Sequence, residues 1–246
     1  MARISVDDEL VARKARLAQI GAFGGTLLLV AGLALYFLEI YGVFGFQVSG
    51  LLGLSLALLV VGFVMGSVGN RGLTLWVHQP RADQLLARAA KGWDDRHRLY
   101  SYLLPADHVL LAPHGLYVIL AKAVDGRVTS VGDRWRRNLS LLRLLRGFGP
   151  APLGNPTKEL KKQVRALRGL LSAVETETDP QGEAGEIHGL VVFTHPQIYL
   201  EVQNPSVPVM PLRSLKSYMR KQARQQSLSD QLYQEWLKIL DGAAAA

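Results

Sequence analysis

The chain has 246 residues, no cysteine and a formal charge of +8 at pH 7. This length accommodates one ordinary domain with an appendage rather than two full domains. The lack of cysteine excludes disulfides, thiolate metal sites and cysteine nucleophiles, and the histidines show no zinc-site spacing. The excess of basic residues favours anionic partners, whether lipid headgroups or nucleic acid.

The N-terminal part of the chain is strongly apolar. Between Arg16 and Arg71 the only charged residue is Glu39, and uncharged runs cover residues 20–38 and 48–68. Each run has about the 20 residues that a helix needs to cross a hydrocarbon core. A buried hairpin in a soluble protein is the alternative, but such long uncharged runs are rare in soluble cores. A cleaved signal peptide is disfavoured because a long charged segment precedes the first run. We therefore predict a transmembrane helical hairpin.

Basic residues flank this hairpin at only one end. Residues before the first span and after the second include Arg3, Arg13, Lys14, Arg16, Arg71, Arg81, Arg88 and Lys91. The connection between the spans, residues 39–47, contains neither Lys nor Arg. By the positive-inside rule, both termini are expected on the cytoplasmic side of the cytoplasmic (inner) membrane.

Small residues give the hairpin a packing signal. Gly21 and Gly25 come early in the first span, and Gly62 and Gly66 come late in the second. In an antiparallel pair these glycines lie at the same level, where helix backbones can approach closely. The pattern fits packing within the hairpin or packing against a partner subunit.

From residue 76 onward the composition is that of a mixed globular domain, so we predict domains at 1–75 and 76–246. Patterns of hydrophobicity and turn residues predict an α/β domain. A short helix is expected at 80–93, strands at 97–104, 107–113, 116–122 and 127–131, a basic helix at 157–174, strands at 187–194 and 207–211, and helices at 212–226 and 228–240, with a frayed end at 243–246.

A basic segment interrupts this regular pattern. Residues 134–146 alternate leucines with Arg134, Arg136, Arg137, Arg143 and Arg146. One interpretation is a basic loop whose leucines turn toward the core. Another is an interfacial segment with leucines in lipid and arginines on phosphates. Contact with nucleic acid is a third.

Several motifs together resemble a known family. The stretch "GWDDRHRLYSYLLPADHVLLAPHGLYVILAK" is followed by a turn at Gly126, by Trp135, by Asn155-Pro156 and a helix with Gln163, and then by "GLVVFT". This order is similar to that of the nuclease-related domain, a branch of the restriction-endonuclease-like superfamily, over roughly residues 80–215. The resemblance implies a mixed β-sheet flanked by helices.

The resemblance also implies a catalytic site. Members of the superfamily use one acid and an acid-x-lysine motif to bind Mg²⁺ and an attacking water. Here Asp107 matches the first acid, Lys122 the lysine and Gln163 a glutamine on the following helix. Leu120 stands where the second acid is expected, and a leucine cannot bind a metal. Any metal at Asp107 is therefore expected to bind weakly.

Three alternatives stay open for these residues. In the first, the second acid has migrated to a helix, where Glu159, one turn before Gln163, takes that role. Asp107 can instead cap a turn while Lys122 is a solvated strand end, or the two can belong to a residual phosphate-binding pocket. His108 and His114 have no obvious partner and are interpreted as structural or surface residues.

These expectations define two functions. The first is a membrane-anchored, catalytically degenerate nuclease-like domain that acts as a binding or accessory module without a cofactor. Its expected partners are the lipid bilayer, other membrane subunits and nucleic acid. The alternative is a DNA or RNA nuclease at the inner face of the membrane that uses Mg²⁺ or Mn²⁺.

Overall fold

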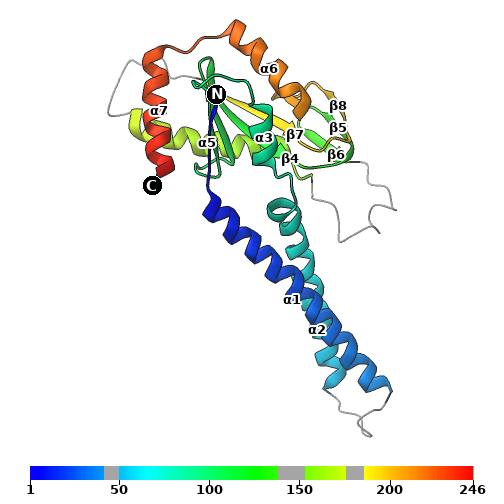
Figure 1. The fold of residues 1–246 in the computed structure, drawn as a ribbon. Coiled ribbons are helices and arrows are strands. Elements are labelled where there is room, and N and C mark those ends of the chain that lie inside the picture. Colours follow the sequence, from blue (N-terminus) through cyan, green and yellow to red (C-terminus); the bar gives the residue numbers. More distant parts are fainter. Residues whose placement is uncertain (42–49, 138–152, 176–185, 246) are drawn as a thin grey trace. The chain divides into compact units, whose positions relative to one another are not determined.

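A computed structural model describes residues 1–41, 50–137, 153–175 and 186–245 (Figure 1). Contacts divide them into a helical unit within residues 8–81 and a globular unit that contains residues 1–7 and the described residues from Ala82 onward. The predicted domain boundary between residues 75 and 76 stays a prediction. The inclusion of residues 1–7 in the globular unit was not expected from the sequence.

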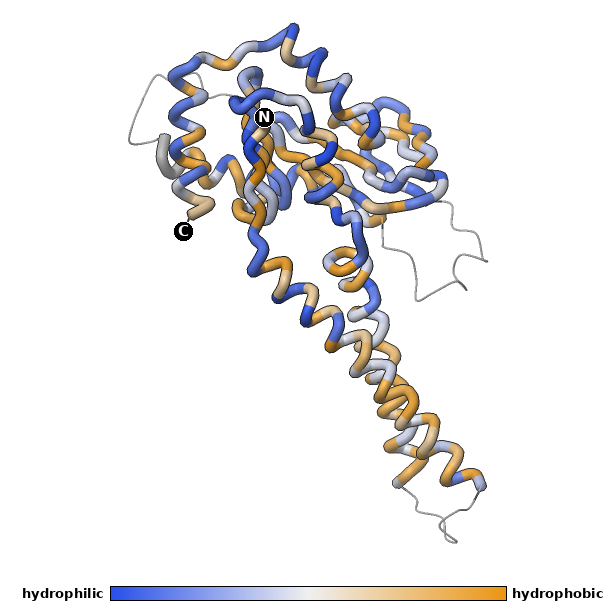
Figure 2. The backbone as a smooth tube through the Cα atoms, in the orientation of Figure 1, coloured by the Kyte–Doolittle hydropathy of each residue, from blue (hydrophilic) through white to orange (hydrophobic). Residues whose placement is uncertain are grey.

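The helical unit consists of α1 (Asp8–Ile40), α2 (Leu51–Gly72) and a π-helical turn, η1 (Leu73–Val77). Helix α1 and the helical stretch that begins at Leu51 are long and apolar enough to cross a membrane. Apolar residues predominate along most of both helices, as the hydropathy colours of Figure 2 show. Helix α1 begins well before the predicted span because residues 8–19 continue the same helix with charged side chains.

Small residues form the contact between α1 and α2. The buried positions recur every seven residues: Ala18, Gly25 and Gly32 on α1, and Ser55, Gly62 and Gly69 on α2. A seven-residue repeat keeps one stripe of each helix against its partner along a slight left-handed supercoil. The helical unit is therefore an antiparallel hairpin with a seam of small residues.

The backbones at this seam are too close for side chains. A Cβ atom added to Gly25 would lie 2.2 Å from the Gly66 nitrogen, and one added to Gly62 would lie 2.8 Å from the Gly25 oxygen. A Cβ on Gly21 would lie 3.1 Å from the Gly69 Cα atom. All four glycines singled out in the sequence thus face the other helix of the same hairpin.

The main sheet of the globular unit has six strands in the order β1-β2-β3-β4-β7-β9. They are β1 (Arg3–Val6), β2 (Arg98–Ser101), β3 (His108–Ala112), β4 (Gly115–Lys122), β7 (Ile187–Phe193) and β9 (Val209–Pro211). Antiparallel pairing joins β2, β3 and β4, whereas β1·β2, β4·β7 and β7·β9 are parallel. The predicted mixed sheet is present.

Helices cover both faces of this sheet. On one face, α5 (Pro156–Glu175) and α7 (Asp230–Ala245) contribute Leu160, Leu167 and Trp236 to a core with Leu116, Val118 and Leu120 of β4. On the other face, α3 (Ala82–Ala89) and α6 (Leu212–Gln225) contribute Leu86, Leu215 and Met219 to a core with Tyr117 and Ile119. Because successive side chains of a strand point to opposite faces, β4 must be apolar at nearly every position.

A second, three-stranded sheet has the order β6-β5-β8. It consists of β5 (Gly126–Val131), β6 (Arg134–Arg137) and β8 (Ile198–Gln203). Strand β8 was not predicted from the sequence. The interpretation of residues 134–137 as the start of an irregular segment was wrong, because they form β6. Gly132, with a φ of +58°, allows the tight turn that folds β6 back on β5. Helix α7 also extends to Ala245, where fraying was expected.

Candidate functional site

Asp107 lies immediately before β3, on the side of the sheet that faces α5. Its carbonyl accepts a hydrogen bond from the Tyr102 backbone N–H at 2.8 Å. Strands β3 and β4 pair with Val109 opposite Val118, so continuing this register by two residues places Asp107 opposite Leu120. Directly opposed residues of an antiparallel pair project from the same face. Asp107 and Leu120 therefore share one face of the sheet.

Leu120 is a core residue. Its exposed fraction is 3%, and it belongs to the cluster that contains Leu160 and Phe193. Lys122, two positions further along β4, projects from the same face because side chains alternate along a strand. An alkyl side chain thus fills the position between Asp107 and Lys122 where the resemblance implies a carboxylate.

Helix α5 brings the two remaining predicted residues to this face. Its start is fixed by Asn155, whose Oδ1 accepts a hydrogen bond from the Lys158 N–H at 3.0 Å, and by Pro156 in the first turn. Glu159 and Gln163 are four residues apart and therefore lie on the same side of the helix. Both point toward the end of the sheet that carries Asp107 and Lys122.

Each of these helix residues binds one residue of the sheet. Lys122 Nζ donates to Glu159 Oε2 at 2.6 Å, with exposed side-chain fractions of 15% and 43%. Gln163 Nε2 donates to Asp107 Oδ2 at 2.5 Å, and the Gln163 side-chain oxygen accepts from the Asp107 backbone N–H at 3.4 Å. The four predicted residues come together as two adjacent pairs.

Further polar groups that the sequence analysis did not identify surround these pairs. The Thr194 N–H donates to the Lys122 carbonyl at 3.0 Å, and within the described chain its buried hydroxyl has no hydrogen-bond partner. Trp135 Nε1 donates to Thr157 Oγ1 at 2.9 Å, which ties β6 to the first turn of α5. No pattern along the sequence pointed to these contacts because they join segments far apart in the chain.

Asp133, in the turn between β5 and β6, forms a second link to α5. It accepts hydrogen bonds from Ser206 Oγ at 2.6 Å and from Lys161 Nζ at 3.0 Å. The Ser206 hydroxyl, and then Lys161, hold the pKa of the Asp133 carboxyl below its usual range. The basic helix α5 is thus attached to the small sheet by an ion pair as well as by the Trp135 hydrogen bond.

The donor set at this site does not suit a nuclease-type metal centre. Mg²⁺ needs several oxygen ligands in near-octahedral geometry. Asp107 supplies one carboxylate, Leu120 supplies none, and Glu159 is engaged by the Lys122 ammonium. Among the described residues, no group of three His, Asp or Glu side chains is arranged to hold a metal ion.

Both histidines near the motif are interior residues. His108 is 2% exposed and His114 is 5% exposed, and His108 Nδ1 lies 3.1 Å from the Ser101 hydroxyl oxygen. The pKa of each is lowered to about 4, mainly by burial, and for His114 the neighbouring His97 and His188 contribute to the same decrease. Both lie inside the globular unit, and their interpretation as structural residues stays a prediction.

The basic residues of segment 134–146 differ in their surroundings. Arg134 and Arg136 are exposed on β6. The Arg137 side chain is only 6% exposed and forms an ion pair with Asp125, so its charge is already neutralised. Arg143 and Arg146 lie outside the described residues.

The segment that carries the paired residues matches the model of a known family. Residues 81–194 match the family model of the nuclease-related domain. This nuclease-related segment runs from the start of α3 to the residue after β7, and it includes Asp107, Lys122, Glu159 and Gln163. The resemblance seen in the sequence is confirmed for this segment. No curated protein and no solved structure matches the chain.

Proposed function

We propose that this chain is a membrane-anchored, nuclease-like module that binds its partners without cleaving nucleic acid. The observation that carries the proposal is the burial of Leu120 opposite Asp107. It removes the second carboxylate of the expected metal site, while Lys122 and Asp107 are bound by Glu159 and Gln163. Without a second acid, Mg²⁺ has too few anionic ligands to activate water.

The anchor in this proposal is the α1–α2 hairpin. The glycines at its seam contact the other helix of the hairpin, and large apolar side chains lie on its outer surface. Exposed examples are Phe23, Leu27, Val60 and Phe63. Such a surface is suited to lipid tails or to the helices of another membrane subunit. The accessory role in a larger membrane assembly rests on this surface.

A cleavage assay tests the proposal. The full chain is used in detergent micelles, because β1 at its N-terminus belongs to the globular sheet. Single- and double-stranded DNA and RNA are incubated with Mg²⁺ or Mn²⁺ and with the native chain, Asp107→Ala or Leu120→Glu. We expect no cleavage by the native chain or Asp107→Ala. Cleavage by the native chain that Asp107→Ala abolishes would overturn the proposal.

One observation favours a second candidate, a nuclease with a migrated acid. Glu159 lies one turn from Gln163, which holds Asp107, so a rotation of the Glu159 side chain away from Lys122 would bring two carboxylates closer. In the same assay this candidate predicts native cleavage that is lost in Glu159→Gln. Glu235→Gln on α7, at a partly exposed position, is the matched control and should retain activity.

The proposed orientation, with both termini cytoplasmic, has its own test. Since the chain contains no cysteine, single cysteines can be introduced at Ser49 between the spans and at Ser227 after α6. In spheroplasts, a membrane-impermeant maleimide is expected to label Ser49→Cys and to label Ser227→Cys only after lysis. Labelling of Ser227→Cys in intact spheroplasts would reverse the orientation.

A further inference from the structure

The outer face of the three-stranded sheet carries an unusual combination of side chains. Along β5, Val128 and Ser130 are buried, so Arg127 and Thr129 project outward. The register places Arg127 opposite Tyr199 of β8, and Thr129 opposite both Arg136 of β6 and Glu201 of β8. Because directly opposed residues share a face, these side chains form one continuous surface.

A hollow of about 470 Å³ elsewhere on the unit is lined by both apolar and charged residues, whereas the hollow on this face is lined by polar and charged residues alone. Its volume is about 360 Å³, and its lining is Arg127, Thr129, Arg136, Arg137 and Glu201. Arg127 is paired with Glu201 and Arg137 with Asp125. For Arg136, which is exposed, the described residues provide no ion-pair partner. The hollow therefore contains a guanidinium that no carboxylate of the described residues neutralises and that can bind a phosphate group.

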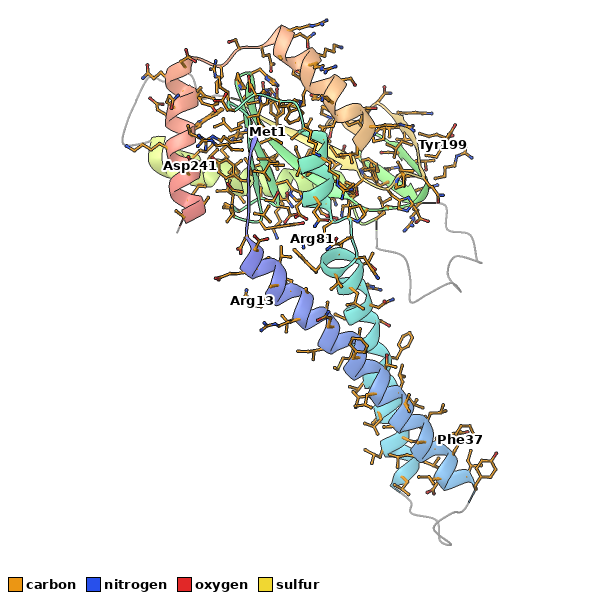
Figure 3. The ribbon with its side chains drawn as sticks, in the orientation of Figure 1. Met1, Arg13, Phe37, Arg81, Tyr199 and Asp241 are labelled. Atoms are coloured by element: carbon orange, nitrogen blue, oxygen red, sulfur yellow. The ribbon has the colours of Figure 1, made fainter. Side chains whose placement is uncertain are left out.

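An aromatic ring stands beside this hollow. The Tyr199 side chain, labelled in Figure 3, is 61% exposed. The Arg127 guanidinium carbon lies 5.4 Å from the ring centroid, and Glu201 holds that guanidinium. The ring is thus steadied from one side while most of its surface is open to solvent. An exposed aromatic ring next to arginines on a sheet is the arrangement on which unpaired bases stack.

We propose that this outer face binds single-stranded nucleic acid, with a phosphate at Arg136 in the hollow and a base stacked on Tyr199. A lipid surface fits less well. Apart from Tyr199, the strongly exposed apolar side chain on these strands is Val131, while Thr129 and Gln203 would lose their hydration in an apolar layer. The surface is separate from the Asp107–Lys122 site, so the inference goes beyond the proposed function and does not depend on it.

The test measures binding of a fluorescein-labelled oligothymidylate of about 20 nucleotides, longer than one such site needs. The full chain is held in nanodiscs of neutral phosphatidylcholine, and fluorescence anisotropy gives the Kd. We expect Tyr199→Ala to raise the Kd about tenfold, Tyr199→Phe to restore it, and Arg136→Gln to raise it by a similar factor. Arg220→Gln removes an equally exposed arginine that lines a basic hollow on α6 and should change the Kd less than about twofold.

Three results would overturn the inference. The first is an absence of oligothymidylate binding by the native chain. The second is an equal rise in the Kd for oligothymidylate in Arg136→Gln and Arg220→Gln, with no change in Tyr199→Ala. This result would mean that binding depends only on the net charge of the protein. The third comes from co-flotation of the nanodisc-held chain with phosphatidylserine vesicles. It is the result that Tyr199→Ala and Arg136→Gln weaken binding to the vesicles but leave oligothymidylate binding unchanged.

Discussion

The residues that would hold a metal in a nuclease hold one another in this chain. The Lys122 ammonium is mostly buried and needs an acceptor, which Glu159 provides at 2.6 Å. A hydrogen bond to a charged group contributes about 1.5–3 kcal/mol, and the partial exposure of Glu159 reduces this value. Leu120 adds apolar packing beside both pairs. These contacts hold the four residues in place through bonds within the chain.

Two buried histidines predict how stability depends on pH. His108 and His114 have pKa values of about 4, against an ordinary value of 6.5. Between these values the unfolded chain takes up protons that the folded chain does not, so stability falls as the pH falls. We expect the melting temperature, followed by tryptophan fluorescence, to decline from pH 6.5 toward 5 and to be insensitive to these groups above pH 7.

His108→Asn identifies the source of this decline. The variant lacks the titrating ring, so its melting temperature should change less steeply than that of the native chain between pH 7 and 5. An equal slope in the two proteins would mean that His108 does not titrate on unfolding in this range.

Among the elements, the packing of α1 against α2 depends on the absence of Cβ atoms at the seam glycines. Its helices approach so closely at Gly25 and Gly69 that an added Cβ would lie 2.2 Å and 2.1 Å from backbone nitrogens of the other helix. In a lipid bilayer, whose tails are as apolar as the helices, close backbone packing would supply much of the association free energy. The seam glycines are therefore required for the close approach of the two helices.

Gly25→Ala should separate the helices. Overpacking typically costs about 1–3 kcal/mol, and here the clash is with backbone atoms that cannot rotate away. Gly53→Ala on α2 is the matched control, because nothing lies within 4 Å of its added Cβ and it gains the same helix propensity. Spin labels on α1 and α2 should report a wider separation for Gly25→Ala only. Equal distances between the helices in the two variants would contradict the claim that α1 and α2 pack through their glycines.

Elements with long periodic patterns, and short strands framed by turn residues, could be predicted from the sequence, whereas β1, β6 and β8 could not. The apolar runs of α1 and α2, the continuous apolar β4 and the amphipathic α5 each contain enough residues to define a period. Strands β1 and β6 have four residues each, and their pairing depends on partners distant in the chain. The seven-residue spacing of Ala18, Gly25 and Gly32 was visible in the sequence, but only Gly25 was singled out from it.

The sequence singled out four residues that the structure brings together, but it did not specify their contacts. The resemblance pointed to Asp107, Lys122 and Gln163, and to Glu159 as a possible migrated acid one turn before Gln163. That Glu159 binds Lys122 while Gln163 binds Asp107 depends on how α5 docks on the sheet, which one-dimensional spacing does not specify. The same is true of Tyr199, which lies on a strand missed in the sequence analysis.

The whole molecule consists of a helical unit long and apolar enough to cross a membrane and a globular unit that matches the nuclease-related domain over residues 81–194. The family gives the scaffold, but activity depends on the site that the scaffold carries. The central claim is that Leu120 has removed the metal site while the surrounding scaffold persists.

Mn²⁺ binding measured by electron paramagnetic resonance on the full chain in detergent micelles tests this claim most directly. We expect the native chain to leave Mn²⁺ free and Leu120→Glu to bind it, because the new carboxylate lies opposite Asp107. Bound Mn²⁺ should also raise the melting temperature of Leu120→Glu, since a ligand that binds the folded state stabilises it. Binding of Mn²⁺ by the native chain that is lost in Asp107→Ala would contradict the account.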